Sequence, residues 1–283
     1  MQFATLQDHL AADKLSGIDL VAELGFDGLE LIVPDGIHEV GSHGMSLNRR
    51  HQPIEDDLVF SQDGRKQLRS RAEPYDLEFP SICPSFMNMR PGLIASDTNE
   101  REVAIGHLES LIEAAEPLGA HTILVPFFIE AEIETDAHKR NVVDSLSALA
   151  PTAAAAGVTL AIETTLDARA NRALLEEIDH AAVALYYDVA NVINFGYNPA
   201  PEIRELGEHI QQVHFKTQNQ DGDHALLADG VVDFEAVADA LAAIEYDRWI
   251  VLETSYVDDP TEAMAANLAY ARAMLRDAGL LST

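Results

Sequence analysis

The chain has 283 residues, of which 47% are hydrophobic and 6% aromatic, enough apolar material for a folded core and too much for a disordered chain. Acidic residues outnumber basic ones by 48 to 18 along the whole chain, and this net charge of −30 disfavours a nucleic-acid backbone or an anionic membrane as partner. The single cysteine, Cys83, excludes an internal disulfide, and no apolar run or N-terminal leader indicates a membrane span or export, so we expect a cytoplasmic protein.

Short β-rich runs alternate with amphipathic helical runs over the whole length. The eight expected strands are Gln2–Leu6, Gly28–Val33, Leu77–Cys83, Thr122–Phe127, Val158–Glu163, Ala184–Asp188, Gln211–Lys216 and Ile250–Thr254. The expected helices are Ile18–Leu24, Arg65–Tyr75, Glu100–Leu118, Ala137–Ala156, Arg172–Ile178, Pro201–Leu206, Phe234–Ile244 and Pro260–Ala278. Gly25 and Gly119 are placed to end two of these helices before the next strand.

This alternation predicts an α/β protein with βα units around a parallel sheet. Eight such units in about 280 residues match a single (β/α)8 TIM barrel, whereas a doubly wound sheet usually stops at five or six strands. No linker rich in Pro, Gly or Ser divides the chain, so we expect one domain over residues 1–283. The long irregular segment His38–Asp63, which contains the pair Arg49-Arg50, follows the second strand and is expected to overhang the site face.

Four expected strands in the second half of the chain end in a side chain that can bind a metal ion. These residues are Glu163, Asp188, His214 and Glu253. Because the C-terminal ends of neighbouring barrel strands converge on one rim, all four would surround one point. Each alone has a simpler explanation as a helix cap, a solvated carboxylate or a core histidine, but the set favours a metal site. Three carboxylates and one imidazole suit Mn²⁺, Mg²⁺, Co²⁺ or Zn²⁺ with open positions for substrate oxygens.

Six short segments occur in a fixed order over nearly the whole chain. They are Gly25-Phe26-Asp27-Gly28-Leu29-Glu30-Leu31, Ala161-Ile162-Glu163-Thr164, Tyr187-Asp188-Val189-Ala190-Asn191 with Gly196-Tyr197-Asn198-Pro199, Val213-His214-Phe215-Lys216, Asp229-Gly230-Val231-Val232-Asp233-Phe234 and Leu252-Glu253-Thr254. Together they resemble the sugar phosphate isomerase/epimerase family of xylose isomerase-like TIM barrels. The resemblance implies one divalent metal ion held by Glu163, Asp188, His214 and Glu253. It also implies that the two glutamates double as the acid/base pair in the ketose 3-epimerase branches.

Three further residues are candidate substrate contacts. Lys216 follows His214 on the same strand face and could bind a substrate hydroxyl, carboxylate or phosphate, with a salt bridge to a neighbouring acid as the alternative. Asn191 occupies a position where many relatives have a second histidine that contacts substrate. Glu30 ends the second strand and faces the expected rim, with a helix-cap role as the alternative.

The chemistry of the two glutamates favours proton transfer. Removing a proton next to a ketose carbonyl gives an enediolate, whose charge a metal ion that chelates the carbonyl and the adjacent hydroxyl would neutralise. Two carboxylates on opposite faces of that plane can remove the proton from one side and return it on the other. We therefore expect a metal-dependent isomerase or epimerase of a small-molecule sugar or sugar phosphate, with Glu163 and Glu253 exchanging protons. A homo-oligomer is compatible with the resemblance.

Other activities compete with this expectation. A dehydratase of the inosose type would start from the same deprotonation and then expel a hydroxyl group. A trinuclear zinc nuclease resembling endonuclease IV needs additional histidines, yet Asn191 stands at one such position and the third strand ends in Cys83-Pro84. Thr164 and Thr217 replace an asparagine and an aspartate common in relatives, so the particular sugar cannot be carried over. A non-catalytic metal-binding barrel fits less well with an open site that includes two glutamates.

The charge also leads to a prediction about salt. We interpret the acidic surface as that of a halophilic protein, because concentrated salt screens its self-repulsion, with an ordinary acidic enzyme as the alternative. We expect the melting temperature to rise between about 0.1 M and about 2 M KCl as the screening length shrinks. Differential scanning calorimetry measures this rise, and a melting temperature unchanged by KCl would contradict the interpretation.

Overall fold

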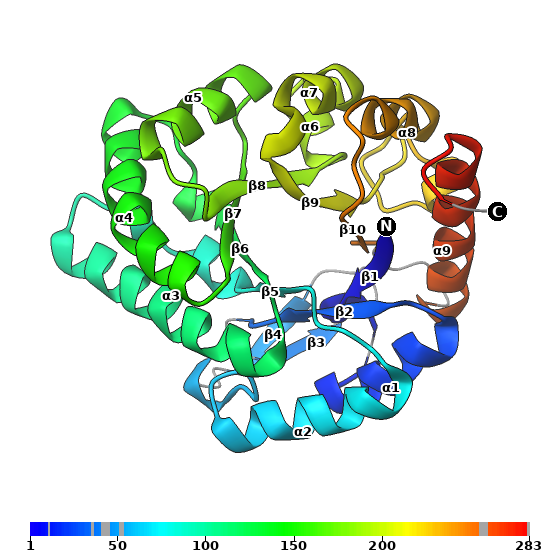
Figure 1. Ribbon diagram of the computed structural model, residues 1–283, viewed down its shortest axis with the longest axis horizontal. Helices are drawn as coiled ribbons and strands as arrows, with labels where there is room; N and C mark the ends of the chain where they lie inside the picture. The colour runs from blue at the N-terminus through cyan, green and yellow to red at the C-terminus, as the bar shows by residue number, and fades with distance from the viewer. Residues whose placement is uncertain (11, 35–36, 41–45, 51–53, 255–259, 282–283) are drawn as a thin grey trace.

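Eight parallel strands form a closed barrel, with helices around its outside (Figure 1). The computed structural model describes all residues except 11, 35–36, 41–45, 51–53, 255–259 and 282–283. The order of the strands around the barrel is β1-β10-β9-β8-β7-β6-β5-β2, and every pair is parallel. The predicted (β/α)8 TIM barrel is therefore confirmed.

The barrel strands are β1 Gln2–Leu6, β2 Gly28–Ile32, β5 Ser81–Cys83, β6 Thr122–Phe127, β7 Thr159–Thr164, β8 Val183–Asp188, β9 Ile210–Phe215 and β10 Trp249–Leu252. The helices are α1 Lys14–Leu24, α2 Gln62–Ala72, α3 Thr98–Leu118, α4 Asp136–Ala155, α5 Ala168–Ile178, α6 Asn191–Asn194, α7 Pro199–Leu206, α8 Phe234–Ala243 and α9 Pro260–Asp277. Within the described ranges, no helix is both long and apolar enough to cross a membrane.

Local sequence signals explain where several helices begin and end. The side chains of Asp13 and Asp97 accept backbone N–H groups at the N-termini of α1 and α3. Gly25 and Gly119 end the same two helices with φ angles of 82° and 76°, a left-handed conformation that glycine adopts without steric cost. These two glycines are the ones that the sequence places at helix ends.

Two expectations about the first half of the chain need correction. The third barrel strand covers only Ser81–Cys83, because Pro80 has no N–H group and Glu78 forms only an isolated bridge with Gly28. The segment expected to be irregular contains an antiparallel hairpin outside the barrel, with β3 at Ile37–Val40 and β4 at Ser46–Arg50. The side chains of this hairpin, those of the Arg49-Arg50 pair included, lie outside the described part of the structure.

The interior of the barrel combines apolar and polar side chains on the inward faces of the strands. Its apolar part is a small cluster of Ala4, Leu6, Ile32, Cys83, Leu124, Ala161, Tyr186 and Val251. A much larger apolar layer packs between the strands and the surrounding helices. Since side chains alternate along a strand, the residue two positions beyond an inward-facing one also faces inward.

Candidate metal and catalytic site

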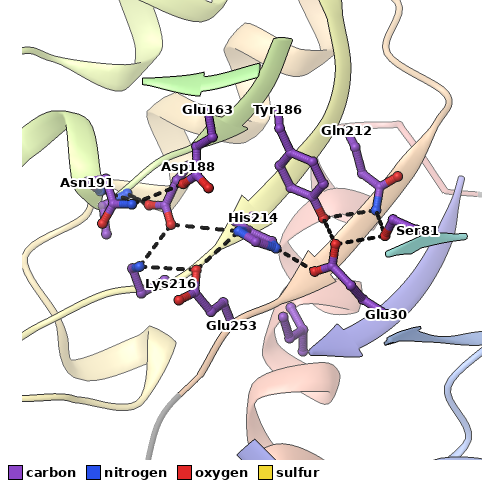
Figure 2. Close-up of polar contacts among 12 residues, drawn as sticks. Glu30, Ser81, Glu163, Tyr186, Asp188, Asn191, Gln212, His214, Lys216 and Glu253 are labelled. Carbon is purple, nitrogen blue, oxygen red and sulfur yellow. Dashed lines mark hydrogen bonds and ion pairs between the residues drawn. The ribbon is translucent and has the colours of Figure 1, made fainter. Parts of the chain in front are cut away.

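Four neighbouring strands deliver the expected metal-binding residues to one rim of the barrel (Figure 2). Glu163 lies near the end of β7, Asp188 ends β8, His214 lies in β9 and Glu253 directly follows β10. Ala161, Tyr186 and Val251, two positions before Glu163, Asp188 and Glu253, belong to the interior cluster, and Gln212, two before His214, bonds to Tyr186 there, so strand alternation directs all four into the barrel. Because β7, β8, β9 and β10 are adjacent in this order, the four side chains form one continuous arc.

The distances show how closely these groups approach. Glu163, Asp188 and His214 are buried, and each offers a ligand atom within 4.8 Å of the others. The Nδ1 atom of His214 lies 3.1 Å from Oε2 of Glu253. The Nζ atom of Lys216 lies 3.0 Å from Oδ2 of Asp188 and 3.1 Å from Oε2 of Glu253. The structure therefore brings all four residues and Lys216 together.

Two atoms in this cluster suit a metal ion. The Oδ1 atom of Asp188 accepts backbone N–H groups from Ala190 and Asn191, both at 2.7 Å, which leaves Oδ2 facing the cluster. Oδ2 of Asp188 and Nδ1 of His214 are buried without a hydrogen bond of acceptable geometry, although charged groups lie within ion-pair distance. Buried polar atoms normally have a partner, and a divalent cation would satisfy both. The residues present thus fit such an ion.

Burial and mutual charge shift the acidities of the cluster. Burial raises the pKa of Glu163 to about 8, with His214 opposing this shift and Asp188 adding to it. Burial also raises the pKa of Asp188, against the opposing effect of Lys216. Burial lowers the pKa of His214, but the carboxylates of Glu30 and Glu253 outweigh it and raise that pKa well above its usual value. Without a metal ion, Glu163 therefore holds its proton to a higher pH than an exposed glutamate does.

Glu30 lies behind the cluster instead of facing the cavity. Its side chain is completely buried, and Oε2 is 2.8 Å from Nε2 of His214. Its other oxygen, Oε1, accepts hydrogen bonds from Ser81 and Tyr186. The predicted substrate contact does not fit this position, because both oxygens are already used and neither is exposed. Ser81, Tyr186 and Gln212 were not anticipated, although polar residues at inward-facing strand positions were a signal for them.

The other two expected substrate contacts lie beside the cluster. Nδ2 of Asn191 donates a hydrogen bond to Oε1 of Glu163 at 3.0 Å, and both residues line the cavity. Lys216 forms the salt bridges that were the alternative to substrate binding. Thr164 and Thr217 hold the loops after their strands, through hydrogen bonds to the side chain of Asn171 and from the backbone of Val232.

A cavity of about 480 Å³ opens in front of the cluster, a volume that suits a small molecule. Its polar lining includes Glu163, Asn191, His214 and Glu253. Its apolar lining includes Leu6, Ile32, Leu124, Phe128 and Phe195. The cavity thus combines groups that can move protons with an apolar wall that limits water.

Comparison with known proteins identifies the family. Residues 18–274 match the sequence model of the Xylose isomerase-like TIM barrel family. The chain belongs to this family. The predicted resemblance is thereby confirmed, and the match covers the entire cluster described above.

Individual members of this xylose isomerase-like family resemble the chain over different lengths. A 2-epi-5-epi-valiolone 7-phosphate 2-epimerase from Actinoplanes sp. is 27% identical over 267 residues, which cover 93% of this chain and 91% of the relative. An inosose dehydratase from Geobacillus kaustophilus is 27% identical over 117 residues, which cover 35% of this chain and 37% of the relative.

Solved structures share the fold of this family member. An L-ribulose 3-epimerase superposes with a TM-score of 0.78 at 18% identity, covering 98% of this chain and 95% of that one. The D-psicose 3-epimerase from Clostridium cellulolyticum H10, solved with D-tagatose, gives a TM-score of 0.77 at 18% identity, covering 97% of this chain and 99% of that one.

The acidity of Glu163 predicts how stability depends on pH without metal. Its folded-state pKa of about 8 lies above the usual value of 4.5, so the folded protein holds an additional proton between these values. Stability therefore falls as the pH rises through this window. Glu163→Gln removes this titration and can still accept the hydrogen bond from Asn191. We expect its melting temperature to fall less than that of the wild type between about pH 5 and about pH 9.

Differential scanning calorimetry of protein treated with a chelator measures this effect. Glu109→Gln, at an exposed position of α3, is the matched control and should follow the wild-type curve. Parallel curves for Glu163→Gln and the wild type would show that Glu163 does not titrate as inferred.

Proposed function

We propose that this chain is a divalent-metal-dependent isomerase or epimerase of a sugar or sugar phosphate, acting by proton transfer next to a ketose carbonyl. The observation that carries the proposal is the placement of Glu163 and Glu253, which lie on either side of Asp188 and His214 (Figure 2). Both glutamates line one cavity. The relative that covers most of the chain is named as an epimerase, which supports the same class of reaction. We further propose that residues 1–283 act as one cytoplasmic domain on a small molecule.

Four residues of the cluster would hold the metal ion: Glu163, Asp188, His214 and Glu253. Their oxygen and nitrogen donors suit Mn²⁺, Mg²⁺, Co²⁺ or Zn²⁺. When bound, the ion would neutralise the charge that develops on the substrate oxygens as the neighbouring carbon loses its proton. Lys216, which contacts Asp188 and Glu253, would keep these carboxylates oriented.

The two glutamates have different neighbouring groups, and each can serve one half of a proton exchange. Glu253 lies within ion-pair distance of Lys216 and His214, and as a carboxylate at the cavity it can take up a proton. Glu163 lines the cavity and receives a hydrogen bond from Asn191, so it is positioned to give a proton back to the substrate. Return of the proton from the opposite face inverts the carbon, and which glutamate acts first depends on the configuration of the substrate.

A dehydratase is the second candidate. The partial similarity to an inosose dehydratase favours it, because loss of water can begin with the same proton removal. The two activities differ in their products, since a dehydratase releases water and leaves an unsaturated compound. Product analysis therefore separates them.

Metal binding is the first test of the proposal. We expect protein stripped with a chelator to bind one Mn²⁺ ion per chain. Asp188→Asn should lower the affinity by at least about tenfold, since a neutral amide oxygen replaces a carboxylate in the ligand set. Isothermal titration calorimetry with elemental analysis measures both quantities, and Asp179→Asn, in the turn after α5, is the control. More than one tightly bound ion, or an Asp188→Asn variant with wild-type affinity, would contradict the assignment.

Proton exchange is the second test. With Mg²⁺ in D₂O and concentrated KCl, the protein should replace the hydrogen next to the carbonyl of one sugar by deuterium and produce a new sugar. Proton NMR with a panel of ketoses, ketose phosphates and inososes follows this reaction. At Mg²⁺ concentrations that keep its metal site occupied, Glu253→Gln should lose exchange by about 10²- to 10⁴-fold, the usual contribution of an acid/base group.

The outcomes of this second test are distinct. Glu109→Gln should exchange as the wild type does. An unsaturated product would support the dehydratase, and a Glu253→Gln variant that exchanges normally would remove Glu253 from the reaction.

A further inference from the structure

A network of buried polar side chains lies on the side of the His214 ring opposite Asp188 and Glu253 (Figure 2). It joins four strands, and its members are Glu30 of β2, Ser81 of β5, Tyr186 of β8, and Gln212 and His214 of β9. All five are at most 2% exposed. Other inward-facing positions of the barrel carry small apolar residues such as Ala4, Ala161 and Val251. Burying five polar groups where apolar ones suffice is costly unless every hydrogen bond is made.

The directions of these hydrogen bonds follow from the chemistry of the donors. Nε2 of Gln212 lies 2.7 Å from the hydroxyl oxygen of Ser81 and 2.9 Å from that of Tyr186. An amide nitrogen has two protons and no free lone pair, so both hydroxyl groups accept from it. Each hydroxyl then has its own proton to give. Both lie close to Oε1 of Glu30, at 2.8 Å and 2.9 Å, and donate to it.

This arrangement settles which nitrogen of His214 keeps its proton. With two donors on Oε1, Glu30 is satisfied as a carboxylate, and its Oε2 can only accept. The atom 2.8 Å from Oε2 is Nε2 of His214, which therefore donates. Nδ1 is the nitrogen on the other side of the ring, 3.1 Å from Oε2 of Glu253 and 3.9 Å from Oδ2 of Asp188.

We propose that Glu30, supported by Ser81, Tyr186 and Gln212, is a positioning residue that holds the Nε2 proton and the ring plane of His214. This leaves Nδ1 as the nitrogen that binds the divalent cation. The inference that a divalent cation binds Nδ1 rests on the proposed function, whereas the location of the Nε2 proton does not. The ring of Tyr186 also packs on the imidazole, with centroids 4.3 Å apart, and restricts its rotation.

The chain contains a matched control for this network on the other face of the same strand. Tyr187, the next residue of β8, is 4% exposed and donates a hydrogen bond to Glu202 at 3.0 Å. Glu202 also accepts the backbone N–H group of Ala168. Tyr186→Phe and Tyr187→Phe therefore each remove one buried hydroxyl that donates to a glutamate, but only the first of these glutamates contacts His214.

The experiment compares these variants by metal affinity and by NMR. Isothermal titration with Mn²⁺ should show an affinity about 10- to 100-fold weaker in Glu30→Gln, the usual effect of losing the carboxylate partner of a metal-binding histidine. Tyr186→Phe should show a smaller loss in the same direction. In metal-free protein with ¹⁵N-labelled histidine, the Nε2 proton of His214 should exchange slowly with solvent in the wild type and faster in both variants. The His214→Gln variant assigns its signal.

The control variants Tyr187→Phe and Glu202→Gln should lower the melting temperature and leave both readouts at their wild-type values. If Glu30→Gln and Tyr186→Phe behave like these controls, the network only stabilises the fold and the proposal is wrong. If Glu30→Gln does not fold, Tyr186→Phe carries the comparison, because it keeps the ring that packs on His214. A wild type that binds no Mn²⁺ but shows the expected exchange would refute the proposed occupant and support the placement of the proton.

Discussion

The site of this protein depends on how the negative charges of its buried carboxylates are compensated. Carboxylates taken out of water are tolerated only when cationic groups or hydrogen-bond donors replace the lost hydration. Lys216 supplies that replacement for Asp188 and Glu253, and His214 supplies it for Glu30 and Glu253. The compensation is incomplete, because carboxylates outnumber the cationic side chains. A divalent cation would complete it, which is why the cluster has the character of a metal site.

His214 links the two polar layers of the barrel. One layer is the rim cluster, in which Glu163 and Glu253 flank Asp188 and face the cavity. The other is the network behind it, in which every polar group of Glu30 finds a donor. The hydrogen bond on Nε2 already fixes the His214 ring, so the ring loses little conformational freedom when a ligand binds Nδ1. The network thus pre-organises His214 for ligand binding.

Particular residues show how far the sequence predicted the structure. Thr122–Phe127 was predicted with its observed bounds, because its uninterrupted run of apolar and β-branched residues is typical of a buried parallel strand. The hairpin at Ile37–Val40 and Ser46–Arg50 was missed, because its residues show no clear periodicity and its two strands pair with each other outside the barrel. The arc from Glu163 to Glu253 was predicted as a group, since a strand end is a local feature and a closed barrel brings neighbouring strand ends together.

The sequence by itself determined the βα alternation, the strand ends that carry acidic and imidazole side chains, and the excess of negative charge. All three are properties of short segments or of composition, and they need no knowledge of distant contacts. Only the tertiary structure decided that Glu30 binds His214 instead of facing the cavity. Its partners Ser81, Tyr186 and His214 are 51, 156 and 184 positions away along the chain. Contacts over such separations exist only once the barrel has closed, so strand periodicity placed these residues inside without showing which of them touch.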